Sequence, residues 1–374
     1  MIVIMNNKKR LEFIKQNYFN NRAISLLPKE KQEEALLLYA NSLLEIVPKK
    51  LYKYRICNDN NLNILREKKA WFSNPSTWND PLDVTVSYDI EKDLQYIKEN
   101  IDKIAINMAF HFINQYIESF CEQKKFVSAD VVKEVYYSAF KGENKFNPTR
   151  LIRYLTPVVG NVPARQITVK TQEALLKVSN SKFKDDLEKQ LENMMSFNKI
   201  KDKLLMYSLS ETYTNNHQWA MYADEGKGFC IGYEIVPKTN KELSLIPNLL
   251  PIYYGKKKPL LVTRFLEESL EYTIRQEGIE ELGNQEAESL FVSFNTKDKQ
   301  WIGEDEWRFS LVSYQCESNK VNFDFAKSLY LGEKIKEYWK NQLIEIAKEQ
   351  NLKVYQRMLD STKSKWIYKR ITIN

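Results

Sequence analysis

The sequence predicts an α+β fold, a mixed or antiparallel sheet core that carries a long helical insertion. Two observations predict it. Apolar and polar residues alternate as in strands near residue 50, and this pattern returns after residue 203. Between them, residues 90–203 are rich in Lys and Glu and have helical periodicity. Because strand patterning flanks the helical segment, we expect an α+β domain at residues 50–374 with an insertion at 90–203, preceded by a helical segment at 1–49.

The first part of the chain is predicted to run helix, strand, helix and strand. The stretch KEKQEEALLLYANSLLEIV has apolar residues at helical spacing, and Pro48 ends it. LYKYRI alternates so that its tyrosines face one side while Lys53 and Arg55 face the other, which predicts a half-buried strand. Asp59 or Asn60 suits the N-cap of a short helix that precedes the short strand AWFS.

Strand signals dominate the chain after residue 203, apart from a helical piece from roughly Thr263 to Phe291. Within DEWRFSLV, alternation places Glu306, Arg308 and Ser310 on one face. A helix, EKIKEYWKNQLIEIAKEQ, separates two strand-like stretches near the end and predicts a βαβ unit. The strands are predicted in LLMYSLSET, GFCIGYEI, PIYYG, DEWRFSLV, SLYLG, KVYQRM and WIYKRITI.

Composition limits the classes of function. The 374 residues are 43% hydrophobic and 13% aromatic, which is enough for a sizeable core, and the net charge of +7 is spread along the chain. The 4 cysteines are far apart and there are 2 histidines, so a zinc site is not expected and the cysteines are predicted to be reduced thiols. The sequence shows neither a signal peptide nor a membrane span, which predicts a cytoplasmic protein without a membrane partner.

The stretch WFSNPSTWNDPLDV, residues 71–84, combines turn formers with aromatic residues. One interpretation is structural: the aromatic side chains bury the turn, and a buried Asn79 satisfies its amides. The other is that this loop walls a pocket, with Ser73 and Asp80 pointing inward and an aromatic ring such as Phe72 available to stack on a planar ligand. The two interpretations are compatible, because a pocket wall needs the same internal hydrogen bonds.

The stretch KQWIGEDEWRF carries the strongest chemical signal. Glu304 and Glu306 are two residues apart, so on a strand both project to the same side, and Arg308 continues that side. Two carboxylates so close need a cation, a metal or a shared proton. The cluster is therefore either a structural salt bridge or a carboxylate-lined cleft.

Two further positions have both a structural and a functional interpretation. Arg55 is either a surface charge or ion-pair partner, or a guanidinium that clamps a diphosphate. Trp219 and Tyr222 lie three residues apart on one face of a predicted helix, where such a pair most often belongs to the core.

Four stretches in this order resemble a bacterial family catalogued as domain of unknown function 2971. They are LYKYR, WFSNPSTWNDPLD, WAMYADEGKGFCIGYE and KQWIGEDEWRF, followed by YLGEKI and KVYQ. The resemblance covers roughly residues 50–370, with the helical insertion as its variable part. The family name confers no activity.

A more distant likeness, in the order of elements, is to ADP-ribosyltransferases. Those folds begin with a strand carrying Arg or His, then a short helix and a second strand, and a late strand carries the catalytic Glu. The likeness implies an ADP-ribosyltransferase-like core that transfers ADP-ribose from NAD or hydrolyses NAD, as a toxin or antiphage effector would. The implied catalytic residues are Glu306, Glu304 and Arg55. The implied ligand-binding residues are Tyr54, Phe72, Ser73, Asp80, Ser208, Ser210, Trp219, Tyr222 and Arg308.

Two other functions stay open. In a magnesium-dependent nuclease, Glu304, Glu306 and Asp80 would hold the cation, and Lys299 would assist. In a non-enzymatic binding or sensor module, the aromatic pocket would hold a small ligand. Under the leading interpretation the partners are NAD as substrate and a macromolecular target, protein or nucleic acid. The helical insertion is expected to bind a partner or to self-associate.

Overall fold

The computed structural model describes residues 5–121, 138–139, 145–178, 189, 201–265, 285–312 and 318–372. The chain divides into two compact units. The sheet unit comprises Met1–Thr85, Phe197–Lys257 and Phe291–Asn374, and the helical unit comprises Val86–Ser196 and Lys258–Leu290.

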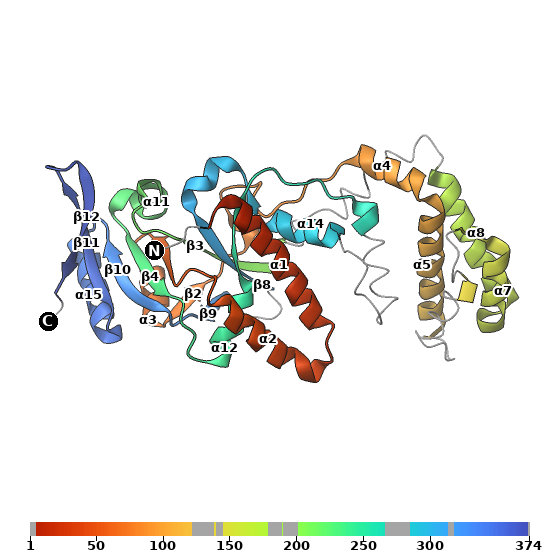
Figure 1. The fold of residues 1–374 in the computed structure, drawn as a ribbon, viewed down its shortest axis with the longest axis horizontal. Helices are drawn as coiled ribbons and strands as arrows, with labels where there is room; N and C mark the ends of the chain where they lie inside the picture. Colours follow the sequence, from red (N-terminus) through yellow and green to blue (C-terminus); the bar gives the residue numbers. More distant parts are fainter. Residues whose placement is uncertain are drawn as a thin grey trace. The chain divides into compact units, whose positions relative to one another are not determined.

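An eight-stranded, mostly antiparallel sheet forms the centre of the sheet unit (Figure 1). The strand order is β12-β11-β10-β4-β1-β3-β8-β5, and β10 and β11 are the parallel pair. The strands are β1 (Lys50–Arg55), β3 (Leu204–Ser210), β4 (Phe229–Glu234), β5 (Leu249–Pro251), β8 (Glu306–Val312), β10 (Ala326–Leu331), β11 (Lys353–Asp360) and β12 (Lys365–Ile371). Two small sheets pair β2 (Lys69–Trp71) with β9 (Lys320–Asn322), and β6 (Tyr253–Tyr254) with β7 (Thr296–Lys297). The predicted α+β class and sheet core are confirmed.

One face of the large sheet packs against helices in the main hydrophobic core. Leu43 from α2, Leu65 from α3 and Ile346 from α15 are buried there with side chains from the strands. In chain order, α15 connects β10 to β11, which pair in parallel, so the predicted βαβ unit is present. The helices of this unit are α1 (Asn7–Ser25), α2 (Lys29–Leu43), α3 (Asp59–Arg66), α11 (Asn216–Tyr222), α12 (Asn240–Leu243) and α15 (Glu337–Gln350), and α14 (Gln285–Phe294) ends in it. Its 3-10 turns are η1 (Pro75–Thr77), η2 (Asp224–Gly226), η3 (Ile246–Asn248) and η5 (Lys299–Glu304).

The opposite face of the sheet carries an aromatic cluster beneath α11. Trp219 of α11 meets the ring of Tyr54 edge-on, with the ring centroids 5.4 Å apart. Tyr330 stacks between Tyr213 and Tyr355 at 4.1 and 5.1 Å. These side chains anchor α11, which places its polar residues at the edge of the site described below.

The helical unit has its own core where α5, α7 and α8 pack together. Its described helices are α4 (Ile90–Glu99), α5 (Ile101–Cys121), α7 (Pro148–Val159) and α8 (Asn161–Val178). The buried carboxylate of Asp93 in α4 accepts hydrogen bonds from the amides of Val262 and Thr263, which ties these two residues to this unit. Part of the predicted helical segment, including most of DDLEKQLENMMSFNKIKDKLL, lies outside the described residues.

Details at the beginning of the chain differ from expectation. Asn58, rather than Asp59 or Asn60, is the N-cap of α3, because its side chain reaches the amide of Asn61. The N-terminal helix α1 packs on β5 and β6 of the sheet unit. Throughout the described chain, we find no helix with both the length and the apolar character that crossing a membrane requires.

The large sheet is split between β1 and β3. These strands share one register pair, Tyr52 with Ser210, whereas β1 pairs with β4 along its whole length. Next to the gap, the amide of Ser73 donates to the carbonyl of Met206, and the amide of Met206 donates back, both at 2.9 Å. Residues 71–84, the aromatic loop, therefore supply the partner of β3 at the point where β1 has moved away.

Candidate functional site

A cavity of about 510 Å³ opens at the split between β1 and β3. This is within the range of small-molecule sites, roughly 300 to 1,000 Å³. All of its lining residues belong to the sheet unit. They are Tyr52, Lys53, Tyr54, Arg55, Ile56, Asn61, Ser73, Thr77, Trp78, Asn79, Asp80, Asp83, Ser208, Leu209, Ser210, Gln218, Met221, Tyr222, Lys297, Trp301, Glu304 and Glu306.

The aromatic loop lies beside β3 at the split between β1 and β3, and it also forms part of the cavity wall. The indole of Trp78 donates to the hydroxyl of Ser73 at 2.9 Å, and Asp80 accepts from the amide of Leu82 at 2.9 Å. The loop is ordered by its own hydrogen bonds, and Ser73, Trp78 and Asp80 also line the cavity, so the two interpretations are compatible. The prediction that a buried Asn79 orders the loop was wrong, because Asn79 is exposed.

Asn74 has the role expected of Asn79. Its side-chain oxygen accepts from the amide of Ser76 at 2.8 Å, and its side-chain nitrogen donates to the carbonyl of Lys201 at 3.0 Å. The difference has a local cause. Asn74 precedes Pro75 and caps η1, so its side chain meets free amides at the start of that turn.

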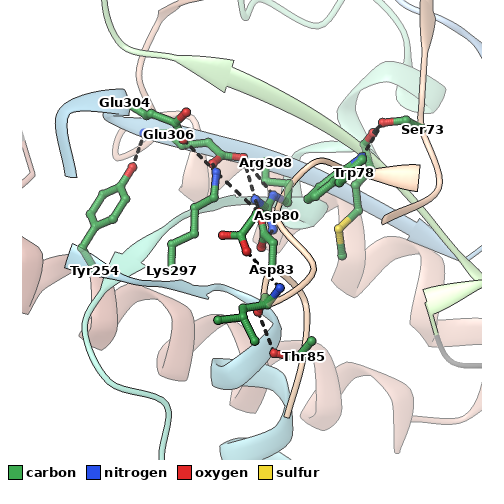
Figure 2. A network of polar contacts seen from close by, with 12 residues as sticks. Ser73, Trp78, Asp80, Asp83, Thr85, Tyr254, Lys297, Glu304, Glu306 and Arg308 are labelled. Atoms are coloured by element: carbon green, nitrogen blue, oxygen red, sulfur yellow. Dashed lines mark hydrogen bonds and ion pairs between the residues drawn. The ribbon is translucent and has the colours of Figure 1, made fainter. Parts of the chain in front are cut away.

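A buried ionic network forms one wall of the cavity (Figure 2). Arg308 donates to Glu306 Oε1 from Nε at 2.9 Å and from Nη2 at 2.8 Å. The Nζ atom of Lys297 lies 2.9 Å from Glu306 Oε2, 2.7 Å from Glu304 Oε2 and 3.5 Å from Asp83 Oδ2. Three carboxylates thus share two cations.

Glu304 reaches this network by a route that the sequence pattern did not indicate. It ends η5 and is not on a strand, and Asp305 after it has a left-handed backbone with φ 43°. The strand β8 begins at Glu306. The two glutamates nevertheless share a side of the cavity, because Lys297 binds both carboxylates and Tyr222 donates to Glu304 Oε1 at 2.7 Å.

The network keeps Glu306 ionised. Burial by itself raises the pKa of this carboxyl, but Arg308 and Lys297 outweigh burial and hold the pKa well below its ordinary value. Burial lowers the pKa of Lys297, and Glu306 and Asp83 reverse this and raise it above its ordinary value. At neutral pH the wall therefore presents fixed charges.

The other wall carries cations without a carboxylate partner. Lys53 donates to the backbone carbonyl of Ser208 at 2.7 Å, and so satisfies an acceptor that β1 would bond in an unsplit sheet. Lys53 and Arg55 both lie over the ring of Tyr207, at 5.0 and 5.7 Å from its centroid. Neither forms an ion pair within the described parts of the chain. Burial and the neighbouring Arg55 lower the pKa of Lys53 to about 7.

Most of the residues predicted for the site line this cavity. They are Arg55, Tyr54, Ser73, Asp80, Ser208, Ser210, Tyr222, Glu304 and Glu306. Several of these have their polar atoms committed within the protein. The hydroxyl of Ser210 donates to the carbonyl of Glu304 at 2.9 Å, and that of Tyr54 donates to the carbonyl of Thr212.

Three predicted ligand-binding residues do not line the cavity. Phe72 is fully buried in the core and stacks on Tyr207. Trp219 is buried on the inner face of α11, in the aromatic cluster. Arg308 is 0% exposed behind the wall, where it lies 4.6 Å from the ring centroid of Trp78 and binds Asp83 and Glu306. Arg308 holds the wall together and has no free surface for a ligand.

Among the lining residues that were missed as site residues, four bear on the charges and hydrogen bonds of the cavity. Lys297 and Asp83 have no local signal, because each meets its partners through the tertiary fold. Gln218 donates to the carbonyl of Glu304 at 2.9 Å, and it likewise meets its partner only through the tertiary fold. The alternation of LYKYRI did place Lys53 on the same face as Arg55, and that signal was sufficient to include it.

The carboxylates do not form a metal-ligand group. Among the residues that the structure describes, no three His, Cys, Asp or Glu side chains are arranged to hold a metal ion. The ammonium group of Lys297 lies between the carboxylates instead. Lys299, expected to assist a metal, is exposed in η5.

A known family model matches a segment of the chain that contributes part of this site. Residues 218–309 match the model of a family described as "Protein of unknown function (DUF2971)". The expected resemblance is confirmed for this segment, which contains Lys297, Glu304 and Glu306 but not Arg55 or Asp83. No curated protein and no solved structure matches the chain. The likeness to ADP-ribosyltransferases therefore has no support from these comparisons.

Proposed function

We propose that the protein is an enzyme that binds NAD in this cavity and transfers its ADP-ribose group or hydrolyses it. One observation carries the proposal. Arg55, Ser208 and Glu306, the Arg, Ser and Glu that an ADP-ribosyltransferase-like arrangement requires, line the same cavity. They come from β1, β3 and β8, which are consecutive strands in the sheet.

The charge distribution of the cavity suits a dinucleotide. Lys53 and Arg55 offer two cations without carboxylate partners to a diphosphate, which a guanidinium binds with two hydrogen bonds. Trp78, Trp301 and the 38% exposed Tyr222 offer rings against which a base or the nicotinamide can stack. Glu304 and Glu306 also line the cavity, where they favour a positively charged group.

The proposed reaction breaks the bond between the anomeric carbon of the ribose and the nicotinamide nitrogen. The bonding electrons move to that nitrogen and neutralise its positive charge, while positive charge develops on the ribose. Glu306, kept ionised by Arg308 and Lys297, stabilises this charge. A nucleophile, either water or a group of the target, then bonds to the anomeric carbon and loses its proton.

The order of elements agrees with this proposal in part. β1 carries Arg55, the short helix α3 follows, and the late strand β8 carries Glu306. The second strand departs from the pattern, since β2 pairs with β9 in a separate sheet. The alternatives are a magnesium-dependent nuclease, in which a cation would have to displace Lys297, and a binding module without catalysis.

An assay of NAD consumption separates these alternatives. Purified protein is incubated with NAD, with and without cell extract as a source of target, in magnesium or in chelator. Wild type is expected to consume NAD in chelator. Glu306→Gln is expected to slow turnover by roughly a hundredfold or more, since one charge-stabilising group contributes about 3–4 kcal/mol to the transition state. The matched control is Glu345→Gln, an exposed residue of α15.

Two results contradict NAD turnover, and a third contradicts the role of Glu306. Cleavage of nucleic acid that chelator abolishes, with NAD untouched, supports the nuclease. Binding of NAD or ADP-ribose without turnover under any condition supports the binding module. Full NAD turnover by a folded Glu306→Gln variant shows that Glu306 is only a structural ion-pair partner.

A further inference from the structure

Two side chains hold the backbone of Glu306, one at its amide and one at its carbonyl. Its amide donates to the hydroxyl of Tyr254 at 2.8 Å, and its carbonyl accepts from Arg10 Nη1 at 2.9 Å. All three residues belong to the sheet unit. Arg10 is 2% exposed, so this bond is shielded from water.

Both of these contacts depend on the N-terminal helix α1. Arg10 is a residue of α1. Asn7, also in α1, clamps the backbone of Tyr254: its side-chain oxygen accepts from the Tyr254 amide at 2.8 Å, and its side-chain nitrogen donates to the Tyr254 carbonyl at 2.7 Å. One turn of α1 thus fixes Arg10 directly on Glu306 and fixes the tyrosine that holds the Glu306 amide.

Arg10 is itself fixed in place. Its Nη2 atom lies 2.5 Å from Glu211 Oε1, and its Nε donates to the carbonyl of Met5 at 3.1 Å. Glu211 also accepts from the indole of Trp307, the residue after Glu306, at 2.7 Å. The guanidinium therefore contacts Glu306 directly and is linked to Trp307 through Glu211.

We infer that Arg10, with Asn7 and Tyr254, is a positioning residue for Glu306, so that α1 is part of the catalytic assembly and not an accessory segment. The reason is geometric. Glu306 is the first residue of β8 and follows the left-handed Asp305. Its carbonyl accepts from the amide of Ile252 at 2.9 Å, whereas its amide bonds the hydroxyl of Tyr254 rather than a strand carbonyl. The contacts from α1 add to the backbone support at this strand end. The inference extends the proposed function to Arg10 and Asn7, which lie well outside the segment that matches the family model.

The first test measures kcat and KM for NAD in Arg10→Met and Tyr254→Phe. Each is expected to lower kcat by about tenfold or more while KM changes by less than about threefold, because the carboxylate acts in the transition state. Arg10→Lys, which keeps the charge and one donor, is expected to recover part of kcat. Because both substitutions act through Glu306, the double variant is expected to be less impaired than the product of the two single effects. Lys9→Met, at an exposed neighbour in α1, is the control.

The second test needs no substrate. In protein labelled with ¹³C at glutamate side-chain carboxyls, the Glu306 signal is assigned by its loss in Glu306→Gln. In wild type it is expected to remain that of a carboxylate through pH 3. In Arg10→Met its midpoint is expected to rise by about one pH unit, since Glu306 then sits less closely against Lys297 and Arg308. Lys9→Met is expected to behave as wild type.

The two tests separate the failure of this inference from the failure of the proposed function. If wild type consumes no NAD, the proposed function fails, and the carboxyl titration alone decides the inference. If Arg10→Met folds, and its Glu306 titration and its kcat equal those of Lys9→Met, the positioning role is wrong. Should Arg10→Met not fold, Tyr254→Phe and Arg10→Lys carry the same comparison, and unchanged values in both overturn the inference.

Discussion

Arg308 and Asp83, which lie 225 positions apart in the chain, form a two-point ion pair in which Nη1 meets Oδ1 at 3.2 Å and Nη2 meets Oδ2 at 3.0 Å. The pair joins the aromatic loop to β8. Because the same guanidinium holds Glu306, the loop and the carboxylate wall form one buried network. The shape of the cavity therefore depends on Arg308 although no ligand can touch it.

Arg308→Met is expected to destabilise the protein by about 3–5 kcal/mol. The substitution leaves three buried carboxylates with Lys297 as their one remaining cation in the network, and breaking a buried pair by removal of one partner has a cost of this size. Urea unfolding measures it. Pairing Arg308→Met with Asp83→Asn is expected to recover part of the loss. A loss no larger than that of Arg370→Met, at an exposed residue of β12, would contradict the role of the pair.

Stability is expected to fall in acid through Glu306. Its folded pKa is depressed, so the group contributes stability that is fully present above its unfolded pKa, about 4.3, and is lost as pH falls toward the folded pKa. The free energy of unfolding in urea should therefore decrease from pH 5 to pH 3. Glu306→Gln should flatten this dependence, and Glu345→Gln should not. Equal slopes in both variants would disprove the assignment.

The affinity for a diphosphate ligand is expected to depend on Lys53. Its pKa near 7 means that the ammonium group loses its proton as pH rises through neutrality, and the cavity loses one positive charge. The Kd for ADP-ribose, measured by calorimetry, should rise between pH 6 and pH 8.5 by at most about tenfold per pH unit. Lys53→Arg should bind well at both ends of this range. If the pH dependence persists in Lys53→Met, another group is responsible; Lys369→Met is the exposed control.

The aromatic loop is expected to depend on Asn74 and not on Asn79. Asn74→Ala removes the cap of η1 and the bond to Lys201, and should destabilise the protein by about 1–2 kcal/mol. Asn79→Ala, at an exposed position, should change stability by less than about 0.5 kcal/mol. Unfolding midpoints of the two variants form a matched pair. A larger effect of Asn79→Ala would reverse the assignment.

Local patterns could predict much of the sheet unit. The alternation of LYKYRI and DEWRFSLV gave the correct strands, because the side-chain period of two is a property of each strand alone. It also placed Glu306 and Arg308 on one side, where they now form an ion pair. The pattern failed two residues before the strand, because Glu304 belongs to η5 and meets Lys297 through the path of the chain.

The sequence by itself therefore determined the α+β class, the identity of most strands of the large sheet, and a cluster of charges at the start of β8. Only the tertiary structure decided which residues join that cluster and which of them neutralise its charges. Asp83 reaches the cluster from a distant part of the chain, and Arg10 bonds the Glu306 carbonyl from the N-terminal helix. Lys297 precedes the cluster and meets it only because η5 turns the chain back. Periodicity in the sequence does not show which residue will neutralise a buried charge. The same holds for the split between β1 and β3. Strand pairing is set by which segments fit side by side, and here the aromatic loop fits against β3 where β1 does not.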